Sequence, residues 1–391
     1  MLALVLAFFV LALVGHAAFW VGVVNRWHSV GLRRVVVKSV TLLFYVALVG
    51  IPLVGLAYVL RFGLPSPDDL TWKFDAVTAY LTFCAAYGAV HIPMWAMERW
   101  RARRLPANVR AQAHRVVDIA QAVGSSPARG PRARFFCRLP YNQLWKMHVE
   151  EFLVDVPGLP AALDGVSICH WADLHVSGRI DRGYYREVVR LTNDMRPDLI
   201  ALSGDICDKA ACIDWLGDLF APAESRLGKY FILGNHDLRT RAVDRVRTVM
   251  CEAGFTDVGC RKCVTFDGQI MIEGNERPWF KSPVTEAEQP PAARADAVKI
   301  LLSHSPDRFD WAQQQGFNLM LAGHTHGGQI RMPVVGAIFC PSRHGTKFAR
   351  GFFWQPPTLL HVSRGTGSLL PLRINCPPEL TKLVLRRVNP A

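Results

Sequence analysis

The first hundred residues contain three long apolar stretches. Residues 2–25, 39–60 and 76–97 carry no Asp, Glu, Lys or Arg. About 20 apolar helical residues cross the hydrocarbon core of a bilayer, so this pattern predicts three transmembrane helices. A cleaved signal peptide is the alternative for the first stretch, but no basic segment precedes it and its apolar run is too long.

From residue 147 onward the pattern changes to short apolar runs that alternate with polar segments. Residues 184–195 are amphipathic and predict a helix after Asp181. The runs that predict strands are residues 148–156, 165–170, 199–202, 230–233, 269–273, 298–302 and 319–321. Helices between strands indicate an α/β layered fold.

The positive charge of the chain lies mainly next to the apolar stretches. Residues 1–150 hold 17 Lys and Arg against 6 Asp and Glu, whereas residues 151–391 hold 28 against 26. A nearly neutral second part argues against a nucleic-acid groove there. Residues 99–146 are rich in Arg and predict a basic linker that lies against anionic lipid headgroups.

The basic residues also predict an orientation in the membrane. Residues 26–38 hold four Lys and Arg and residues 99–110 hold five, whereas residues 61–75 hold two beside three Asp. Basic segments stay on the cytoplasmic side, so we expect an outer N-terminus and a cytoplasmic C-terminal part at the inner membrane. The ten cysteines, irregularly spaced in apolar runs, are expected to be reduced and buried, which suits that compartment.

Two histidines, His16 and His91, fall within the predicted membrane helices. A polar side chain there suggests a proton or lipid contact. A hydrogen bond between helices is the simpler interpretation, and we favour it.

Five of the predicted strands end in side chains that bind metals. Apolar strands followed by such residues at their carboxyl ends are typical of binding sites in α/β sheets. The five motifs are Asp173-Leu174-His175, Gly204-Asp205, Gly234-Asn235-His236-Asp237, Ser303-His304 and Gly323-His324-Thr325-His326. Each fragment alone could be a cap, a turn or a core histidine, but their joint occurrence in this order favours a site.

In these motifs the sequence resembles the calcineurin-like metallophosphoesterase superfamily, over about residues 149–387. The resemblance extends to Gly327-Gly328-Gln329, Ser363-Arg364-Gly365 and Pro377-Pro378-Glu379, which are similar to a bacterial branch with N-terminal membrane segments. It implies a four-layer αββα sandwich of two mixed sheets. We therefore predict a membrane anchor over residues 1–98, the basic linker over 99–146, and the metallophosphoesterase domain over 147–391.

The resemblance also implies a set of ligands for two divalent metal ions. One ion would take Asp173, His175 and His326, the other Asn235, His304 and His324, and Asp205 would bridge them. Two neighbouring cations need such a bridging anion. Imidazole, carboxylate and amide ligands favour Mn, Fe or Zn, without choosing among the three.

The implied nucleophile is a hydroxide held between the two ions, which attacks phosphorus in line. His236 would hydrogen-bond the phosphate and assist the leaving oxygen, and Asp237 would orient the imidazole. For the substrate, the sequence offers Arg277, Trp279 and Lys281 in one loop and Arg343, His344 and Lys347 in another. Of these we single out Arg277 and Lys347.

The function predicted is hydrolysis of a phosphomonoester, phosphodiester or pyrophosphate bond in a substrate at the membrane surface. A lipid substrate is one possibility within this class. One alternative is a UDP-2,3-diacylglucosamine pyrophosphatase of lipid A synthesis, because related enzymes of the superfamily catalyse that reaction. A second alternative is a non-catalytic membrane scaffold, but the complete set of ligands argues against it.

Overall fold

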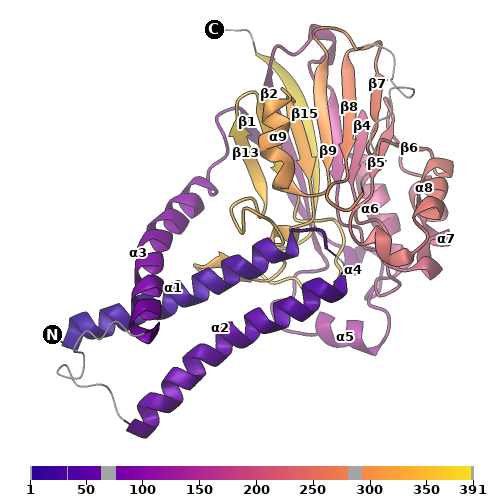
Figure 1. Cartoon of the computed structure of the whole chain (residues 1–391). Coiled ribbons are helices and arrows are strands. Elements are labelled where there is room, and N and C mark those ends of the chain that lie inside the picture. The colour runs from indigo at the N-terminus through magenta and orange to yellow at the C-terminus, as the bar shows by residue number, and fades with distance from the viewer. Residues whose placement is uncertain (1, 33, 63–75, 281–292, 389–391) are drawn as a thin grey trace. The chain divides into compact units, whose positions relative to one another are not determined.

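The computed structural model describes residues 2–32, 34–62, 76–280 and 293–388 (Figure 1). The chain forms two compact units. The helical unit comprises Met1–Arg104 and Pro341–Lys347, and the sheet unit comprises Leu105–Cys340 and Phe348–Ala391.

Three long helices make up most of the helical unit. They are α1 (Leu2–His28), α2 (Arg34–Phe62) and α3 (Ala76–Arg101). Each contains a stretch of 23 to 26 residues that is long and apolar enough to cross a membrane. This confirms the three predicted helices as membrane-competent. The sequence pattern also predicts that the segment near residues 65–69 faces the outer side, and this segment lies outside the described residues.

Helices α1 and α3 approach each other closely at two glycines. A Cβ atom on Gly15 would collide with the backbone of Cys84, and one on Gly88 would lie 2.7 Å from the carbonyl oxygen of Leu11. Small residues allow membrane helices to pack backbone against backbone. His16 lies beside this crossing, where its Nδ1 is 2.6 Å from the Tyr80 hydroxyl and its Nε2 is 3.1 Å from the Leu48 carbonyl oxygen. The interhelical hydrogen bond expected of His16 is therefore confirmed.

Two mixed β-sheets form the centre of the sheet unit. The first has the strand order β1-β2-β15-β3-β4-β5-β6, and the second has the order β13-β14-β10-β9-β8-β7. The first sheet contains β1 (Val109–Asp118), β2 (Lys146–Pro157), β3 (Ser167–Trp171), β4 (Leu199–Ser203), β5 (Lys229–Ile232), β6 (Phe255–Asp257) and β15 (Glu379–Val388). The second contains β7 (Lys262–Thr265), β8 (Ile270–Asn275), β9 (Val298–Ser303), β10 (Leu319–Ala322), β13 (Gly351–Gln355) and β14 (Thr358–Val362). A separate short pair is β11 (Arg331–Met332) with β12 (Gly336–Ala337).

Helices cover both outer faces of this sandwich, as Figure 1 shows. Helices α6 (Arg182–Asp194), α7 (Asp214–Phe220) and α8 (Val243–Glu252) share a hydrophobic cluster with the outer face of the first sheet. Helix α9 (Phe309–Gln314) packs on the second sheet, and an apolar cluster fills the space between the sheets. The predicted four-layer αββα arrangement is confirmed.

Residues 99–146, predicted as a basic linker, carry regular structure over much of their length. Strand β1 pairs with β2 in antiparallel register from Val109 to Asp118, and it is followed by α4 (Ile119–Ala122) and α5 (Pro131–Cys137). Ile119 and Leu144 are buried in the cluster that the first sheet shares with its helices. The compact sheet unit thus begins at Leu105, and contact of this segment with lipid stays a prediction.

Candidate metal centre

The five motifs meet because they follow parallel strands at one edge of the sandwich. In the first sheet, β3, β4 and β5 run parallel and lead into Asp173, Asp205 and Asn235. In the second sheet, β9 and β10 run parallel and lead into His304 and His324. The carboxyl ends of parallel strands present their following loops at a common edge, which is where α/β sheets bind ligands.

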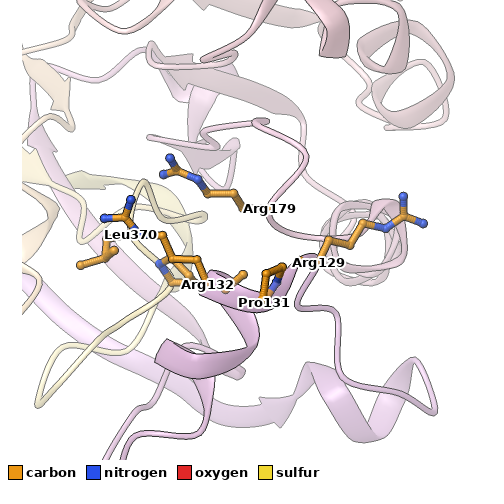
Figure 2. A pocket seen from close by; sticks show the side chains of 8 residues that line it. Arg129, Pro131, Arg132, Arg179 and Leu370 are labelled. Carbon is orange, nitrogen blue, oxygen red and sulfur yellow. The ribbon is translucent and has the colours of Figure 1, made fainter.

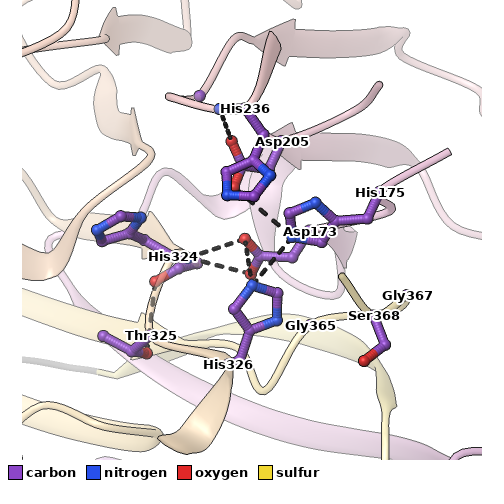
Figure 3. A network of polar contacts seen from close by, with 12 residues as sticks. Asp173, His175, Asp205, His236, His324, Thr325, His326, Gly365, Gly367 and Ser368 are labelled. Atoms are coloured by element: carbon purple, nitrogen blue, oxygen red, sulfur yellow. Dashed lines mark hydrogen bonds and ion pairs between the residues drawn. The ribbon is translucent and has the colours of Figure 1, made fainter. Parts of the chain in front are cut away.

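The first group of ligand atoms comes from Asp173, His175, Asp205 and His326, and these atoms all lie within 4.8 Å of one another. Nε2 of His175 is 3.0 Å from Nε2 of His326 and 3.6 Å from Oδ2 of Asp205. Nε2 of His326 is 3.7 Å from Oδ1 of Asp173. Figure 3 shows these side chains pointing toward one another.

A second group comes from Asp205, His304 and His324. Nε2 of His304 lies 3.3 Å from Oδ1 of Asp205, 3.2 Å from Nδ1 of His324 and 3.2 Å from Oδ1 of Asn235. One oxygen of Asp205 therefore faces a histidine of the first group, and the other oxygen faces a histidine of the second. Buried carboxylates with converging imidazole nitrogens fit divalent cations, whose charge would offset the acids.

Backbone strain accompanies this convergence. Asp173, His175, Asp205, His324 and His326 all have φ between 50° and 69°. This left-handed region is uncommon for residues other than glycine, and such strain clusters at functional sites. The surrounding fold must therefore hold these five side chains in place.

Glycines let the loops approach one another around these residues. A Cβ on Gly204 would lie 2.8 Å from Nδ1 of His304, and one on Gly323 would lie 2.7 Å from Oδ2 of Asp173. Since either contact is closer than side chains tolerate, larger residues at these two positions would displace the candidate ligands.

The loop that follows β14 hydrogen-bonds the backbone at Asp173, a member of the first group. Its Thr366 and Gly367 donate backbone N–H groups to the carbonyl oxygens of Ala172 and Asp173, at 2.7 and 3.0 Å. The fully buried guanidinium of Arg373 donates to the carbonyl oxygen of Gly367 at 2.5 Å. This loop contains Ser363-Arg364-Gly365, which the sequence singled out without a role.

The electrostatics of the site centre on Asp205. Burial alone would raise the pKa of its carboxyl group, but His304, His236 and His175 hold that pKa well below its ordinary value. Burial lowers the pKa of His304, but Asp205 outweighs this effect and raises it to about 9. Asp205 is thus an anion at neutral pH, which suits a ligand shared by two cations.

His236 contacts a carboxylate that the sequence analysis did not select. Its Nδ1 lies 2.5 Å from Oδ1 of Asp208, and the same oxygen lies 3.2 Å from Nδ1 of His175. Asp208 follows the bridging candidate by three positions, and this short spacing in a loop after a strand was the available signal. Burial lowers the pKa of His236 to about 4.

The sequence predicts that Asp237 orients the His236 ring, but the hydrogen bonds of the Asp237 carboxylate go to backbone N–H groups of two loops. Oδ1 of Asp237 accepts the backbone N–H groups of Ile206 and Cys207 at 3.0 and 2.8 Å, and Oδ2 accepts that of Gly234 at 2.8 Å. Asp237 therefore joins the loops after β4 and β5, and the acid that faces the His236 ring is Asp208.

The predicted substrate residues lie in different surroundings. Arg277 is exposed in the loop after β8, and its neighbour Trp279 packs with its ring centroid 4.8 Å from His324 and 5.2 Å from His304. Lys347 belongs to the helical unit, and Lys281 lies outside the described residues. Roles for Arg277 and Lys347 in substrate binding stay predictions.

A pocket of about 90 Å³ is lined by three arginines, Arg129, Arg132 and Arg179 (Figure 2). Arg179 follows His175 by four residues, and Leu370 and Pro371 of the lining continue the loop that holds Asp173. The walls are fixed by the hydrogen bond of Arg179 to the Leu369 carbonyl oxygen, 2.9 Å, and by Arg129 with Asp181, 2.5 Å. Arg179 therefore continues the loop that carries Asp173 and His175, whereas most of the lining comes from residues 129–133, between β1 and β2.

The two-sheet sandwich and the aspartates and histidines that converge at its strand ends fit a metal-dependent phosphoesterase. The family model for calcineurin-like phosphoesterases matches residues 166–328, which include all the candidate ligands. The chain belongs to this family.

Three relatives illustrate the range of the similarity. The Phosphodiesterase YaeI of Escherichia coli (strain K12) is 31% identical over 220 residues, which are 55% of this chain and 80% of that protein. The metallophosphoesterase YkuE of Bacillus subtilis (strain 168) is 32% identical over 243 residues, 59% of this chain and 82% of that one. The UDP-2,3-diacylglucosamine pyrophosphatase LpxG of Chlamydia trachomatis is 23% identical over 300 residues, 61% of this chain and 91% of that one.

Proposed function

We propose that this chain is a membrane-attached phosphodiesterase that uses two divalent metal ions. The observation that carries the proposal is the position of Asp205, whose Oδ2 and Oδ1 lie 3.6 and 3.3 Å from histidines of two separate groups. A carboxylate that gives one oxygen to each of two ions holds them close together, as hydrolysis by a two-metal site requires.

Each ion would have its own ligands in addition to Asp205. Asp173, His175 and His326 would hold the first ion, and Asn235, His304 and His324 the second. The ions, when bound, would polarise the phosphoryl oxygens and activate a water molecule. The ring of Trp279 against His304 and His324 would fix these two imidazoles and exclude water from that side.

His236 would serve the leaving group. Asp208 accepts from its Nδ1, so Nε2 remains for a phosphate oxygen or the leaving oxygen. The negative charge of a bound phosphoester would raise the low pKa of this ring and allow it to carry the proton that the leaving oxygen needs. Asp208 would act as a positioning residue for both His236 and His175.

The arginine-lined pocket would take an anionic part of the substrate away from the scissile bond. Three of its lining residues are arginines and one carboxylate, that of Asp181, pairs with Arg129, so the charge of the residues at and beside the pocket is net positive. Arginine binds phosphate and carboxylate groups through several parallel N–H donors. A membrane lipid with a phosphodiester headgroup combines such charge with a location at the bilayer surface.

Two relatives support different substrates. The similarity to the protein named Phosphodiesterase YaeI favours a phosphodiester, and the similarity to LpxG, named a UDP-2,3-diacylglucosamine pyrophosphatase, supports that nucleotide-linked lipid as the second candidate. The chain covers 80% of the first and 91% of the second. We place the phosphodiester first because this chain is 31% identical to YaeI and 23% identical to LpxG.

The test is hydrolysis by the purified full chain, loaded with Mn, Fe or Zn in turn. We expect turnover of bis(nitrophenyl) phosphate to exceed that of nitrophenyl phosphate at least tenfold, and a lipid phosphodiester to be cleaved faster than UDP-2,3-diacylglucosamine. Faster cleavage of the UDP-linked lipid would replace the first candidate with the second. If no metal supports hydrolysis of any of the four compounds, the chain is a scaffold with the fold of the family.

A further inference from the structure

A second cluster of metal-ligand side chains lies on the first sheet, outside the candidate metal centre. It comprises His114 of β1 with His148 and Glu150 of β2, and one ligand atom of each lies within 4.8 Å of the other two. Nε2 of His114 is 3.0 Å from Nδ1 of His148, which is 3.7 Å from Oε1 of Glu150. The function proposed above makes no use of these residues.

The strand register explains why the three side chains converge. His114 is directly opposite Glu150 in the antiparallel pair β1–β2. His148 precedes Glu150 by two positions, so both point to the same face of the sheet. The cluster thus depends on two rigid neighbouring strands and not on a loop.

The separations suit a small transition-metal ion. Zinc binds imidazole nitrogen at about 2.0–2.1 Å and carboxylate oxygen at about 2.0–2.2 Å, so tetrahedral ligands lie about 3.3 Å apart. The two separations of 3.0 and 3.7 Å bracket that value. His114 is exposed and the side chains of His148 and Glu150 are 24% and 18% exposed, so an ion could enter from solvent.

Partners behind the cluster hold its carboxylate in position. Arg364 donates to Oε1 of Glu150 at 2.9 Å and is itself paired with Glu379. Outer partners of this kind orient the carboxylate ligands of metal sites. Two glutamates against one arginine also leave a negative charge for a cation to offset.

The same arginine leads to the candidate metal centre. Gly365 follows Arg364, and a Cβ on it would lie 3.1 Å from Cβ of Asp173 and 3.2 Å from Nδ1 of His326. The backbone that carries the outer partner of the cluster therefore packs directly against two candidate ligands.

We propose that His114, His148 and Glu150 bind a third divalent ion of the zinc type, which fastens the edge strand β1 to β2. Water would complete its coordination on the exposed side. The simpler alternative is a hydrogen-bonded histidine pair beside an ion pair, with no metal bound.

The first test counts zinc in the purified full chain after dialysis against buffered Zn²⁺, by mass spectrometry of the metal. We expect one zinc fewer per chain in His114→Ala than in the wild type. The control is Arg115→Ala, the next residue on β1, whose side chain points to the other face and reaches Asp194 at 3.8 Å. It should bind as much zinc as the wild type.

The second test separates this ion from the two of the proposed function. In an Asp205→Asn background, which is expected to disturb the two-metal centre, adding His114→Ala should still remove one zinc. Cobalt(II) gives an independent signal, because a tetrahedral site has an intense visible absorption band. This band should persist in Asp205→Asn and disappear when His114→Ala is added. Equal zinc content and equal cobalt spectra with and without His114→Ala would overturn the proposal, whatever the fate of the two-metal centre.

Discussion

Five candidate ligands adopt left-handed backbone conformations that would be unfavourable elsewhere in the chain. Each costs on the order of 1–3 kcal/mol. Hydrogen bonds between neighbouring loops offset this cost. Asp237, for example, accepts hydrogen bonds from three backbone N–H groups. The precise placement of the imidazoles therefore depends on groups that bind no metal themselves.

His236 can be separated from the ligands by experiment. His236→Ala should lower turnover by roughly 10²-fold. Asp208→Asn should lower it by about 10- to 100-fold, because the His236 ring loses its orienting acceptor. His236→Ala should keep nearly the wild-type metal content, measured on the same samples, whereas Asp208→Asn should also weaken metal binding, because Asp208 contacts the candidate ligand His175. Loss of metal in parallel with activity in His236→Ala would move His236 into the ligand set.

Asp237→Asn is the comparison for these variants. It replaces one acceptor oxygen of a buried group that holds two loops, at a cost of about 1–3 kcal/mol. We expect a lower melting temperature in this variant, with wild-type melting in Asp208→Asn. If Asp208→Asn melted at a lower temperature and Asp237→Asn melted like the wild type, the orienting role would return to Asp237.

The sequence predicted which residues meet at the site but not how they are oriented. Motif order brought together Asp173, His175, Asp205, His304 and His326, because each follows an apolar strand. Asp208 was missed because its one signal, the three-residue spacing from Asp205 in a loop after a strand, is weak on its own. The role predicted for Asp237 differs from its observed hydrogen bonds, because adjacency along the chain does not tell which way a carboxylate points.

At the scale of elements, hydrophobic periodicity predicted seven strands but missed the fully buried β14, and also β15, which lies between β2 and β3 in the first sheet. The seven predicted strands correspond to β2, β3, β4, β5, β8, β9 and β10, within a few residues at each end. Strand β1 was not predicted, because its side chains are mostly exposed and include Arg110 and Arg115, which are typical of a basic linker. Edge strands carry such charges and therefore lack the alternating apolar signal.

The crossing of α1 and α3 gives a prediction for the helical unit. Gly15→Leu should destabilise this packing by about 1–3 kcal/mol, because the side chain would be forced into the backbone of α3. Gly55→Leu on α2 is the matched control, since a Cβ there has no atom within 4 Å. The measurement is the temperature at which the detergent-solubilised full chain loses its monodisperse peak. Equal temperatures for the two variants would contradict the close crossing.

For the whole molecule, three membrane-competent helices imply attachment to a membrane, whereas the side on which the sheet unit lies is our proposal. The basic residues of segments 26–38 and 99–110 predict that this unit faces the cytoplasm. Ser66→Cys, in the segment between the second and third apolar stretches, should then react with an impermeant thiol reagent in intact cells. The native Cys251, exposed in the sheet unit, should react after the cells are opened. Reaction of Cys251 in intact cells would invert the topology.

The sequence could predict the anchor and the family, but not where the sheet unit begins. The change to alternating apolar runs suggested a boundary at residue 147, whereas the compact unit begins at Leu105 because β1 pairs along β2 and Ile119 and Leu144 enter the core. Such tertiary pairing leaves no local signal, so a change in the apolar pattern is a poor marker of a domain boundary.

Whether Asp205 joins two metal ions in a hydrolytic site is tested by comparing the wild type with Asp205→Asn for bound metal and turnover. With Asp205 intact, we expect two ions per chain in the candidate metal centre. They are counted in the His114→Ala background, which excludes any ion at the second cluster. In Asp205→Asn we expect fewer than two, with hydrolysis of bis(nitrophenyl) phosphate reduced by at least 10³-fold, equivalent to about 4 kcal/mol of barrier. An Asp205→Asn protein that retains two ions and wild-type turnover would contradict the account.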